Sequence, residues 1–323
     1  MTTPLPTRAK TLDFYVWAGE VSAQSSGVAW KRHGMTTSVL VPNSLAREAE
    51  DRREATRKLG SVARAAAMFR VDRLTVFPDS DGVRRWEDGF VETVLRYAAT
   101  PPYLRKAVWD RRDELEYAGV LPPLRVRTRT GSGSDESGSL RQGIVTEVGA
   151  DGRVRVNCGL QHPVSLPVPD GMATAEGERV TVRVSSRRPV RAKIVDESPP
   201  GFDVDRAGLD AALERDDAGL TVAASRHGQE LSVTRLGQLV ERLEGGDDAA
   251  ETTTEAGTGD LTVAFGAPER GLPAMLGTDP PASGETGDDR FDLWLNTVPN
   301  QGSEVVRTEE AVFATLAPLN LSR

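Results

Sequence analysis

The sequence predicts an α/β fold in which a parallel sheet covered by helices is interrupted by a small antiparallel barrel. Short apolar runs alternate with helical periodicities in residues 1–123 and again in residues 199–323, an order typical of parallel sheets. Residues 124–198 alternate polar and apolar side chains with period two, which indicates antiparallel strands. We therefore expect a discontinuous α/β domain (1–123 and 199–323) and an inserted OB-like β-barrel (124–198).

The first α/β segment contains strand and helix signals in alternation. Apolar side chains recur at three- and four-residue spacing after the first run, which predicts a long helix, and Ser44 is expected to cap it. The expected elements are a strand over Thr36–Val41, this helix through Phe69, a strand over Asp72–Phe77, and helices near Phe90–Ala99 and Tyr103–Glu116.

The inserted segment consists of five short stretches rich in β-branched residues. Turn residues separate them at the spacing expected of a small barrel. The stretches are Gly143–Val148, Arg153–Val156, Pro163–Leu166, Arg179–Val184 and Val190–Val195. The tract Gly131–Ser139 contains only small and polar residues, so we expect it to form a flexible loop.

After Pro199-Pro200-Gly201 the α/β pattern resumes. We expect two acidic loops, over residues 245–259 and 278–289. The expected elements are a helix near Arg206–Glu214, a strand over Leu220–Ala224, a helix near Val233–Leu243, strands over Leu261–Phe265 and Phe291–Leu295, and a final helix through Leu316.

Composition excludes several classes of protein. No apolar stretch is long enough to cross a bilayer, and the first residues lack the layout of a signal peptide. The single cysteine, Cys158, excludes an internal disulfide and a cysteine-based zinc site. We expect a cytoplasmic protein without metal.

The net charge is about +3 for residues 1–120, +3 for 121–198 and −14 for 199–323. This distribution suggests an anionic partner for the first two segments, although solubility alone also explains such asymmetry.

Two glycine-bearing loops near the C-terminus predict a site for a small ligand. Glycine lets backbone groups approach a ligand closely, and the loops Gly266–Leu272 and Asn296–Ser303 each follow an apolar run. The alternative for the first loop is an ordinary strand-to-helix turn. An apolar slot could come from Leu272, Leu295 and Val298. The candidate ligand-binding residues are Gly266, Glu269, Gly271, Leu272, Asn296, Thr297, Pro299, Asn300, Gln301, Gly302, Ser303 and Thr308, of which Thr308 is also expected to be a helix N-cap.

Three arginines are the candidates for chemistry: Arg64 in the first long helix, Arg226 after a strand, and Arg307 before the last helix. A guanidinium can hold a phosphate or a carbonyl through two hydrogen bonds. Each could instead be a solvated or salt-bridged surface residue. His227 could act as a base, but a structural role is favoured for it.

Basic residues on and beside the barrel strands predict an interface with nucleic acid. Residues 124–198 contain no Phe, Trp or Tyr, so binding should be directed to the backbone and sensitive to salt. The alternative is a barrel with ordinary surface arginines. The candidates are Arg153, Arg155, Arg183, Arg187, Arg188 and Arg191.

The chain resembles the SPOUT RNA methyltransferases, and specifically the archaeal-type RNA uridine-N3 methyltransferase group that has a barrel insert. Matching stretches run through nearly the whole sequence, and the most specific covers Phe291–Ala311. Others are Val41-Pro-Asn-Ser-Leu45, Pro102-Tyr-Leu-Arg-Lys106, Tyr117-Ala-Gly-Val-Leu121, Val156-Asn-Cys-Gly159 and Ser225-Arg-His-Gly228. The loop at Gly266 is similar to the Gly-Pro-Glu-Gly-Gly loop of the bacterial rRNA uridine-N3 methyltransferases, except that Arg270 replaces a glycine.

The resemblance implies a C-terminal trefoil knot, S-adenosylmethionine bound in the knot, and a homodimer whose interface helps to build each active site. It implies methyl transfer to uridine N3 in RNA, and ribosomal RNA is the expected substrate. Two alternatives remain open at this point: an RNA-binding protein without catalysis, and a methyltransferase acting on another atom such as a ribose 2′-oxygen.

Overall fold

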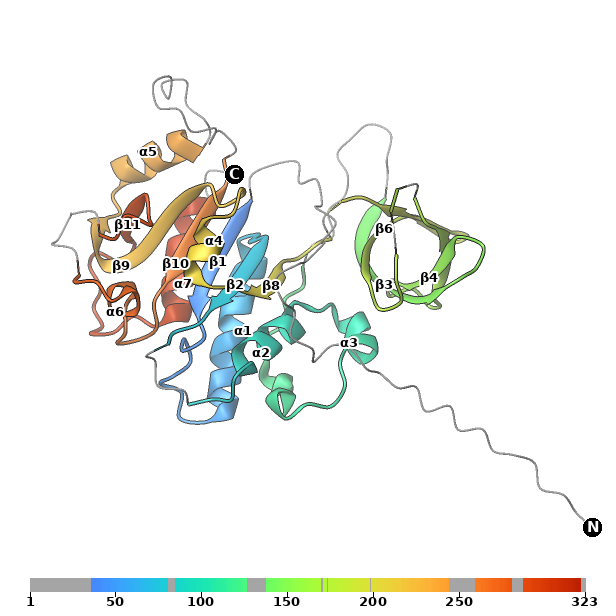
Figure 1. Cartoon of the computed structure of the whole chain (residues 1–323), viewed down its shortest axis with the longest axis horizontal. Coiled ribbons are helices and arrows are strands. Elements are labelled where there is room, and N and C mark those ends of the chain that lie inside the picture. The colour runs from blue at the N-terminus through green and yellow to red at the C-terminus, as the bar shows by residue number, and fades with distance from the viewer. Residues whose placement is uncertain are drawn as a thin grey trace, which may run out of the picture. The chain divides into compact units, whose positions relative to one another are not determined.

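The chain forms a six-stranded parallel sheet and a separate five-stranded antiparallel sheet (Figure 1). The computed structural model describes residues 36–80, 85–126, 138–169, 171–172, 174–197, 199–243, 259–280 and 287–320. The expected loop at Gly131–Ser139 therefore lies largely outside the described residues, as does most of the acidic stretch 245–259. Within the described ranges, no helix combines the length and apolar character needed to cross a membrane.

The parallel sheet has the strand order β11-β9-β10-β1-β2-β8. β1 lies inside it, and Val39 is paired with Val263 on one side and Leu74 on the other. The strands are β1 (Thr37–Pro42), β2 (Arg73–Phe77), β8 (Asp203–Arg206), β9 (Leu220–Glu230), β10 (Leu261–Phe265) and β11 (Leu293–Asn296).

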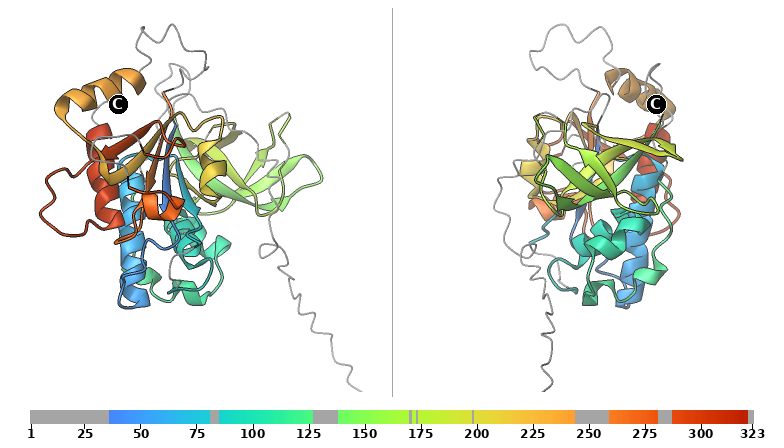
Figure 2. Two further views of the ribbon diagram at one scale, coloured as in Figure 1. Left: turned by 60° about the vertical axis from the view of Figure 1, so that its left-hand side comes forward. Right: turned by 90° about the vertical axis from the view of Figure 1, so that its right-hand side faces the viewer.

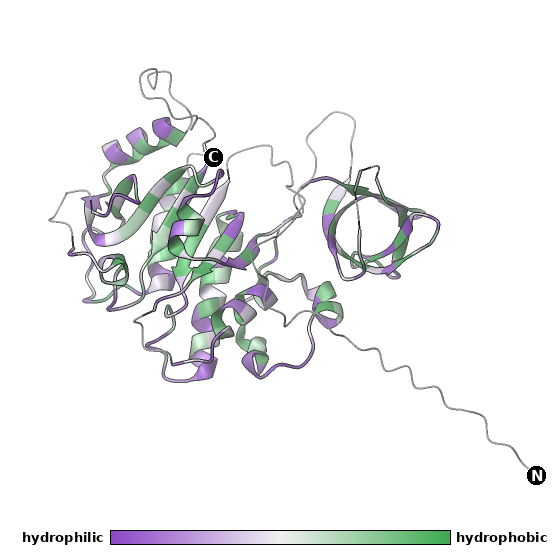
Figure 3. Ribbon diagram, in the orientation of Figure 1, coloured by the Kyte–Doolittle hydropathy of each residue, from purple (hydrophilic) through white to green (hydrophobic). Residues whose placement is uncertain are grey.

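Helices cover both faces of this sheet, as the turned views make clear (Figure 2). Alternate residues of β1 point to opposite faces: Val39 and Val41 join the core under α1, α2, α5 and α7, whereas Leu40 joins the core under α4 and α6. β1 and β10, inside the sheet, are accordingly buried along their whole length, and hydrophobic residues run along the inner strands (Figure 3). The helices are α1 (Arg52–Met68), α2 (Phe90–Ala99), α3 (Pro102–Val108), α4 (Leu209–Leu213), α5 (Val233–Leu243), α6 (Leu272–Leu276) and α7 (Thr308–Leu319).

The antiparallel sheet curls into a nearly closed barrel, seen end-on as a ring in Figure 1. Its order is β5-β4-β3-β6-β7, and inward-facing Val154, Val156, Val182 and Ile194 fill it. The five predicted strands are thus confirmed, with bounds β3 (Ser139–Val148), β4 (Arg153–Asn157), β5 (Val164–Pro167), β6 (Arg179–Arg187) and β7 (Val190–Val195).

Two expectations for the first segment are wrong. The N-cap of α1 is Asp51, whose carboxylate accepts a hydrogen bond from Glu54 N at 2.7 Å; Ser44 instead donates to Asp79 at 2.6 Å. The helix predicted over Tyr103–Glu116 ends at Val108. Trp109 is extended (φ −118°, ψ 124°) and its indole N–H bonds to Thr100 Oγ1 at 3.0 Å. Two short 3-10 turns, Asp113–Leu115 and Ala118–Val120, follow.

Two elements of the last segment have no clear sequence signal. β8 is mostly polar and lies at the edge of the sheet, where it pairs with β2. The helix expected over Arg206–Glu214 is shorter than predicted and consists of the five residues of α4. α6 is one short turn after the first glycine loop. β9 is longer than the predicted strand and continues to Glu230.

Candidate functional site

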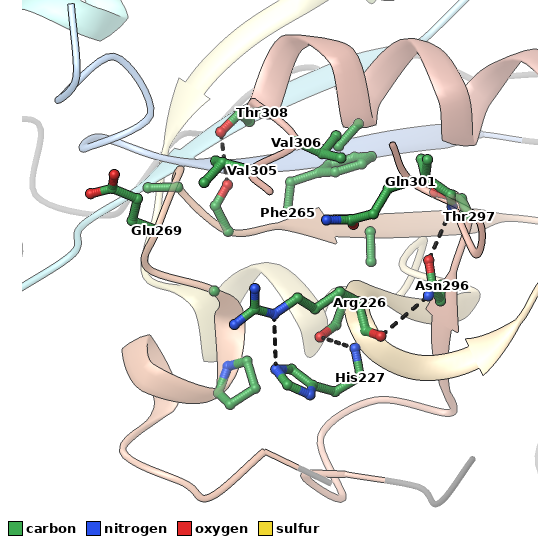
Figure 4. A pocket seen from close by; sticks show the side chains of 18 of the residues that line it. Arg226, His227, Phe265, Glu269, Asn296, Thr297, Gln301, Val305, Val306 and Thr308 are labelled. Atoms are coloured by element: carbon green, nitrogen blue, oxygen red, sulfur yellow. Dashed lines mark hydrogen bonds between the residues drawn. The ribbon is translucent and has the colours of Figure 1, made fainter. Parts of the chain in front are cut away.

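A cavity of about 270 Å3 lies where the loops after β10 and β11 meet the middle of β9 and the start of α7 (Figure 4). Because β9, β10 and β11 run parallel, their carboxyl ends lie at one edge of the sheet, which is where open α/β sheets bind ligands. The two glycine-bearing loops singled out in the sequence therefore line the same cavity.

A bulge in β9 supplies one wall. Trp294 of β11 pairs with Ala223, but the next residue, Leu295, pairs with Gln229. Residues 224–228 are thus left out of the pairing with β11, and they carry Arg226 and His227 to the cavity. Gly228 permits the bulge, because a Cβ there would lie 2.5 Å from Leu295 N.

The first glycine loop is a tight turn. Ala267 and Arg270 exchange two backbone hydrogen bonds, of 3.0 and 3.1 Å, and Glu269 between them has φ +61°. A Cβ on Gly266 would lie 2.8 Å from Gly271 Cα, so only glycine allows the turn to close. Its carbonyl accepts a hydrogen bond of 2.9 Å from Thr308 Oγ1, which joins the loop to α7.

The second loop is stabilised by its own polar side chains. Asn296 Oδ1 accepts from Val298 N at 3.0 Å, and its amide donates to Arg226 O at 3.2 Å. Gln301 donates to Ser303 O at 2.8 Å. Thr297 bonds to Thr315 of α7 at 2.8 Å. These amides and hydroxyls therefore fix the loop backbone before any ligand binds.

Eight predicted residues line the cavity: Gly266, Glu269, Gly271, Asn296, Thr297, Gln301, Thr308 and Arg226. Five predicted ligand-binding residues do not line it: Leu272, Pro299, Asn300, Gly302 and Ser303. Leu272 and Leu295, expected in the apolar slot, are at most 1% exposed and belong to the core. Thr308 is the first residue of α7, and Arg307 is its N-cap, contrary to the expectation.

Arg226 and His227 form the most polar part of the wall, opposite Val305, Val306 and Phe265 (Figure 4). Arg226 Nε donates to His227 Nε2 at 3.2 Å, which requires a neutral imidazole protonated on Nδ1. Burial, and to a smaller extent the Arg226 charge, lowers the pKa of His227. The terminal guanidinium nitrogens of Arg226 have no hydrogen-bond or ion-pair partner within the described part of the chain.

Arg64 and Arg307 lie outside the cavity lining. Arg64 donates to the carbonyls of Pro123 and Leu124, at 3.2 and 2.6 Å, and so ties α1 to the segment that leads into the barrel. Arg307 lies 3.7 Å from Glu48 as a half-exposed ion pair. Only Arg226 of the three predicted catalytic arginines is therefore brought to the site within a single chain.

The barrel arginines differ in their availability. Arg183 is 5% exposed and pairs with Glu197, so it cannot belong to an open surface as predicted. Arg153 bonds to Ser165, and Arg155 lies 3.4 Å from Glu147. The exposed cations at the β6–β7 turn have no ion-pair partner among the described residues; they are Arg187, Arg188 and Arg191.

A family described as "Putative RNA methyltransferase" matches residues 36–319. The chain belongs to this RNA methyltransferase family. An uncharacterized protein of Haloarcula marismortui is 72% identical over 89% of the chain and its own full length. The human 28S rRNA (uridine-N(3))-methyltransferase is 29% identical over 88% of this chain and 77% of its own length. The predicted kinship with RNA methyltransferases is thus confirmed.

Sequence reasoning missed several residues of the methyltransferase that line the cavity. Most are apolar, and the pattern gave no reason to separate them from the core; they are Ala224, Phe265, Val305, Val306 and Ala311. Val298, which the sequence suggested for the apolar slot, does line the cavity. Glu304 is a charged residue that was also missed. The signal that could have found them is their position next to the two glycine loops in the sequence.

Proposed function

We propose that this methyltransferase binds S-adenosylmethionine in the cavity between the two glycine loops and methylates uridine N3 in ribosomal RNA. The observation that supports this most strongly is the convergence of residues 266–271 and 296–306 on one hollow. The human, mouse and fly relatives are named 28S rRNA (uridine-N(3))-methyltransferases, which supports the choice of atom and RNA. Family membership argues against a role limited to RNA binding.

The residues around the cavity suit this cofactor. Phe265, Val298 and Val306 offer apolar surface for an adenine ring. Glu269 and Glu304 offer carboxylates to the positively charged sulfonium and amino groups. When bound, S-adenosylmethionine supplies a methyl group on a positively charged sulfur. Because the backbone of both loops is already fixed, little conformational freedom is lost when the ligand binds.

Arg226 is the residue best placed to act on the uracil. Uridine N3 carries a proton that must pass to solvent water as the new bond to carbon forms and the bond from the methyl carbon to sulfur breaks, so negative charge develops on the ring and its carbonyl oxygens before the methyl group is in place. The terminal nitrogens of Arg226, which face no other described partner, can donate to such an oxygen. His227 already uses Nε2 to accept from Arg226, so it orients the guanidinium.

Several further assignments belong to the same proposal. Residues 1–123 and 199–323 form one discontinuous SPOUT-like domain with a C-terminal trefoil knot, and residues 124–198 form an inserted RNA-binding barrel of OB type. The parallel pairing of β2 with β8, which precede and follow the barrel in the chain, supports the discontinuity. A cytoplasmic homodimer would bring Arg64 of one subunit toward the other subunit's cavity.

Two measurements test the proposal. Calorimetry should detect binding of S-adenosylmethionine, and mass spectrometry should detect loss of N3-methyluridine from the rRNA of a deletion strain. A lost 2′-O-methyl nucleoside would move the activity to the ribose. Absence of any cofactor binding would refute the proposed site.

A further inference from the structure

Arg270, which stands where the bacterial-type loop has glycine, directs its guanidinium to Asp79 and to the backbone of α6. Its Nε donates to Asp79 Oδ1 at 3.1 Å, and its Nη2 donates to Ala274 O in α6 at 3.3 Å. Arg270 does not line the cavity itself, although its neighbours Glu269 and Gly271 do. The side chain therefore acts on the loop from behind.

Asp79 has a buried carboxylate that accepts two hydrogen bonds, and its backbone N–H donates a third. Its side chain is 1% exposed. Besides Arg270, it accepts a hydrogen bond from Ser44 Oγ at 2.6 Å, and its backbone N–H donates to Asn43 Oδ1 at 3.0 Å. A buried charge is stable only when paired and hydrogen-bonded. Asn43 and Ser44 follow β1, so the network connects the ends of β1 and β2 to the loop after β10.

The first glycine loop is consequently held from two sides. Thr308 of α7 holds the carbonyl of Gly266, and Asp79 holds the side chain of Arg270. Glu269 lies between the two anchors with φ +61°, a conformation that persists in a non-glycine residue only where its surroundings enforce it.

We propose that the Asp79–Arg270 ion pair is a positioning device for the cofactor loop, and that Asp79 controls cofactor affinity from outside the cavity. Without the pair, the backbone at Glu269 and Gly271 can relax away from the path that the ligand requires. In this chain the side chain of Arg270 anchors the loop, which the glycine at the same position of the bacterial-type loop cannot do. The inference rests on the proposed cofactor site.

The test compares S-adenosylhomocysteine affinity by calorimetry in Arg270→Gln, Arg270→Lys and Asp79→Asn, with the unliganded melting temperature measured in parallel. Arg73→Gln is the matched control, because Arg73 is as little exposed as Arg270, pairs with the more exposed Asp217 at 2.8 and 2.9 Å, and does not line the cavity. Asp79→Asn nearly preserves the shape of the buried side chain, so it tests the loss of the ion pair even if the arginine variants fold poorly.

We expect Arg270→Gln and Asp79→Asn each to weaken binding roughly tenfold or more. The double variant, Arg270→Gln with Asp79→Asn, should bind no more weakly than either single variant, because both substitutions break the same ion pair. Arg270→Lys should recover part of the affinity because it retains the charge. In steady-state methylation assays the KM for S-adenosylmethionine should rise more than kcat falls.

Arg73→Gln should lower the melting temperature while leaving affinity unchanged. Wild-type affinity in Asp79→Asn and Arg270→Gln would overturn the inference but leave the proposed function intact. Equal losses of affinity in Arg73→Gln would also overturn it, since the effect would then reflect general destabilisation. A wild-type protein that binds neither ligand would overturn the proposed function and the inference together.

Discussion

Gly266 lies where the chain leaves β10, and its lack of a side chain lets the backbone turn back against Gly271. The hypothetical Cβ would approach Gly271 Cα at 2.8 Å and Leu272 N at 2.9 Å, which are backbone atoms that cannot rotate away. Gly302 is different, because a side chain there would meet no atom within 4 Å. The two loops therefore use glycine for different reasons, and only the first needs it for packing.

Replacing Gly266 with alanine should open the first loop, weaken S-adenosylmethionine binding by roughly tenfold, and cost about 1–3 kcal/mol of stability. Calorimetry and chemical denaturation measure the two effects. Gly237→Ala is the control: it lies in α5 with open space around it, so it should raise stability by up to about 1 kcal/mol. Undiminished binding in Gly266→Ala would contradict the packing argument.

His227 is the titratable residue of the cavity wall whose pKa is lowered by burial and then by Arg226. A lowered pKa means that the folded state favours the neutral imidazole. The contribution of His227 to stability is therefore present above the ordinary histidine pKa and declines as pH falls through the pKa of His227 in the folded protein. Protonation would also end the hydrogen bond from Arg226.

Removing the neighbouring charge with Arg226→Gln should raise the pKa of His227, although not fully to the ordinary value, since burial is the larger cause. NMR titration of the imidazole protons measures this shift. A downward shift, or none, would mean that the two side chains do not interact as the 3.2 Å contact indicates.

Among the elements, α7 connects the cavity to the core. Thr308 and Thr315, seven residues or about two turns apart on this helix, bond to the first and second glycine loops respectively. Glu310 accepts a hydrogen bond from Arg307 N at 2.9 Å, which caps the helix start. Glu309 faces inward: it is 9% exposed, and its Oε2 has no hydrogen-bond partner within the described ranges.

Burial raises the pKa of Glu309, and this effect outweighs the lowering caused by a backbone hydrogen bond and by the positive charge of Lys58. An acid with a raised pKa binds its proton more tightly in the folded state, so folding is favoured below the ordinary glutamate pKa and loses that contribution as pH rises through the folded value. Glu309→Gln should therefore be more stable than wild type at neutral pH, with the difference shrinking in acid. Denaturation at both pH values tests this, and a destabilised variant at neutral pH would contradict it.

At the scale of the whole molecule, two sheets divide the proposed work between cofactor binding and RNA binding. The exposed cations of the barrel concentrate at one hairpin, where Ser186 pairs with Arg191 and Arg187 with Val190 across a two-residue turn. Arg155 on β4 faces Glu147, so part of its charge is already balanced.

Charge reversal at the hairpin, Arg187→Glu with Arg188→Glu and Arg191→Glu, should weaken RNA binding without changing cofactor affinity. Each lost phosphate contact should reduce the slope of log affinity against log salt by roughly one unit. Arg155→Glu is the comparison and should have a smaller effect than Arg191→Glu. Filter binding at several salt concentrations distinguishes these outcomes, and an equal loss of cofactor affinity would assign the barrel a structural role.

Much of the fold could be predicted because it depends on periodicity. α2, α5 and β10 have the predicted bounds, and their apolar spacing alone is sufficient to define them. β8 could not be predicted, since its four residues at a sheet edge include only one apolar side chain, Val204, and so have no such pattern. α3 ends at Val108, where the extended Trp109 bonds to Thr100, a contact between two elements that the helical pattern does not encode.

The sequence by itself determined that two glycine loops lie after parallel strands and that the chain resembles RNA methyltransferases, because local spacing and motif identity are properties of neighbouring residues. The tertiary structure decided which of those residues share a cavity. It placed Arg226 in the wall through a shift in β-pairing, buried Arg183 beside Glu197, and joined Arg270 to Asp79 across 191 positions of the chain. Each of these depends on contacts between distant segments, which exist only once the sheets have formed.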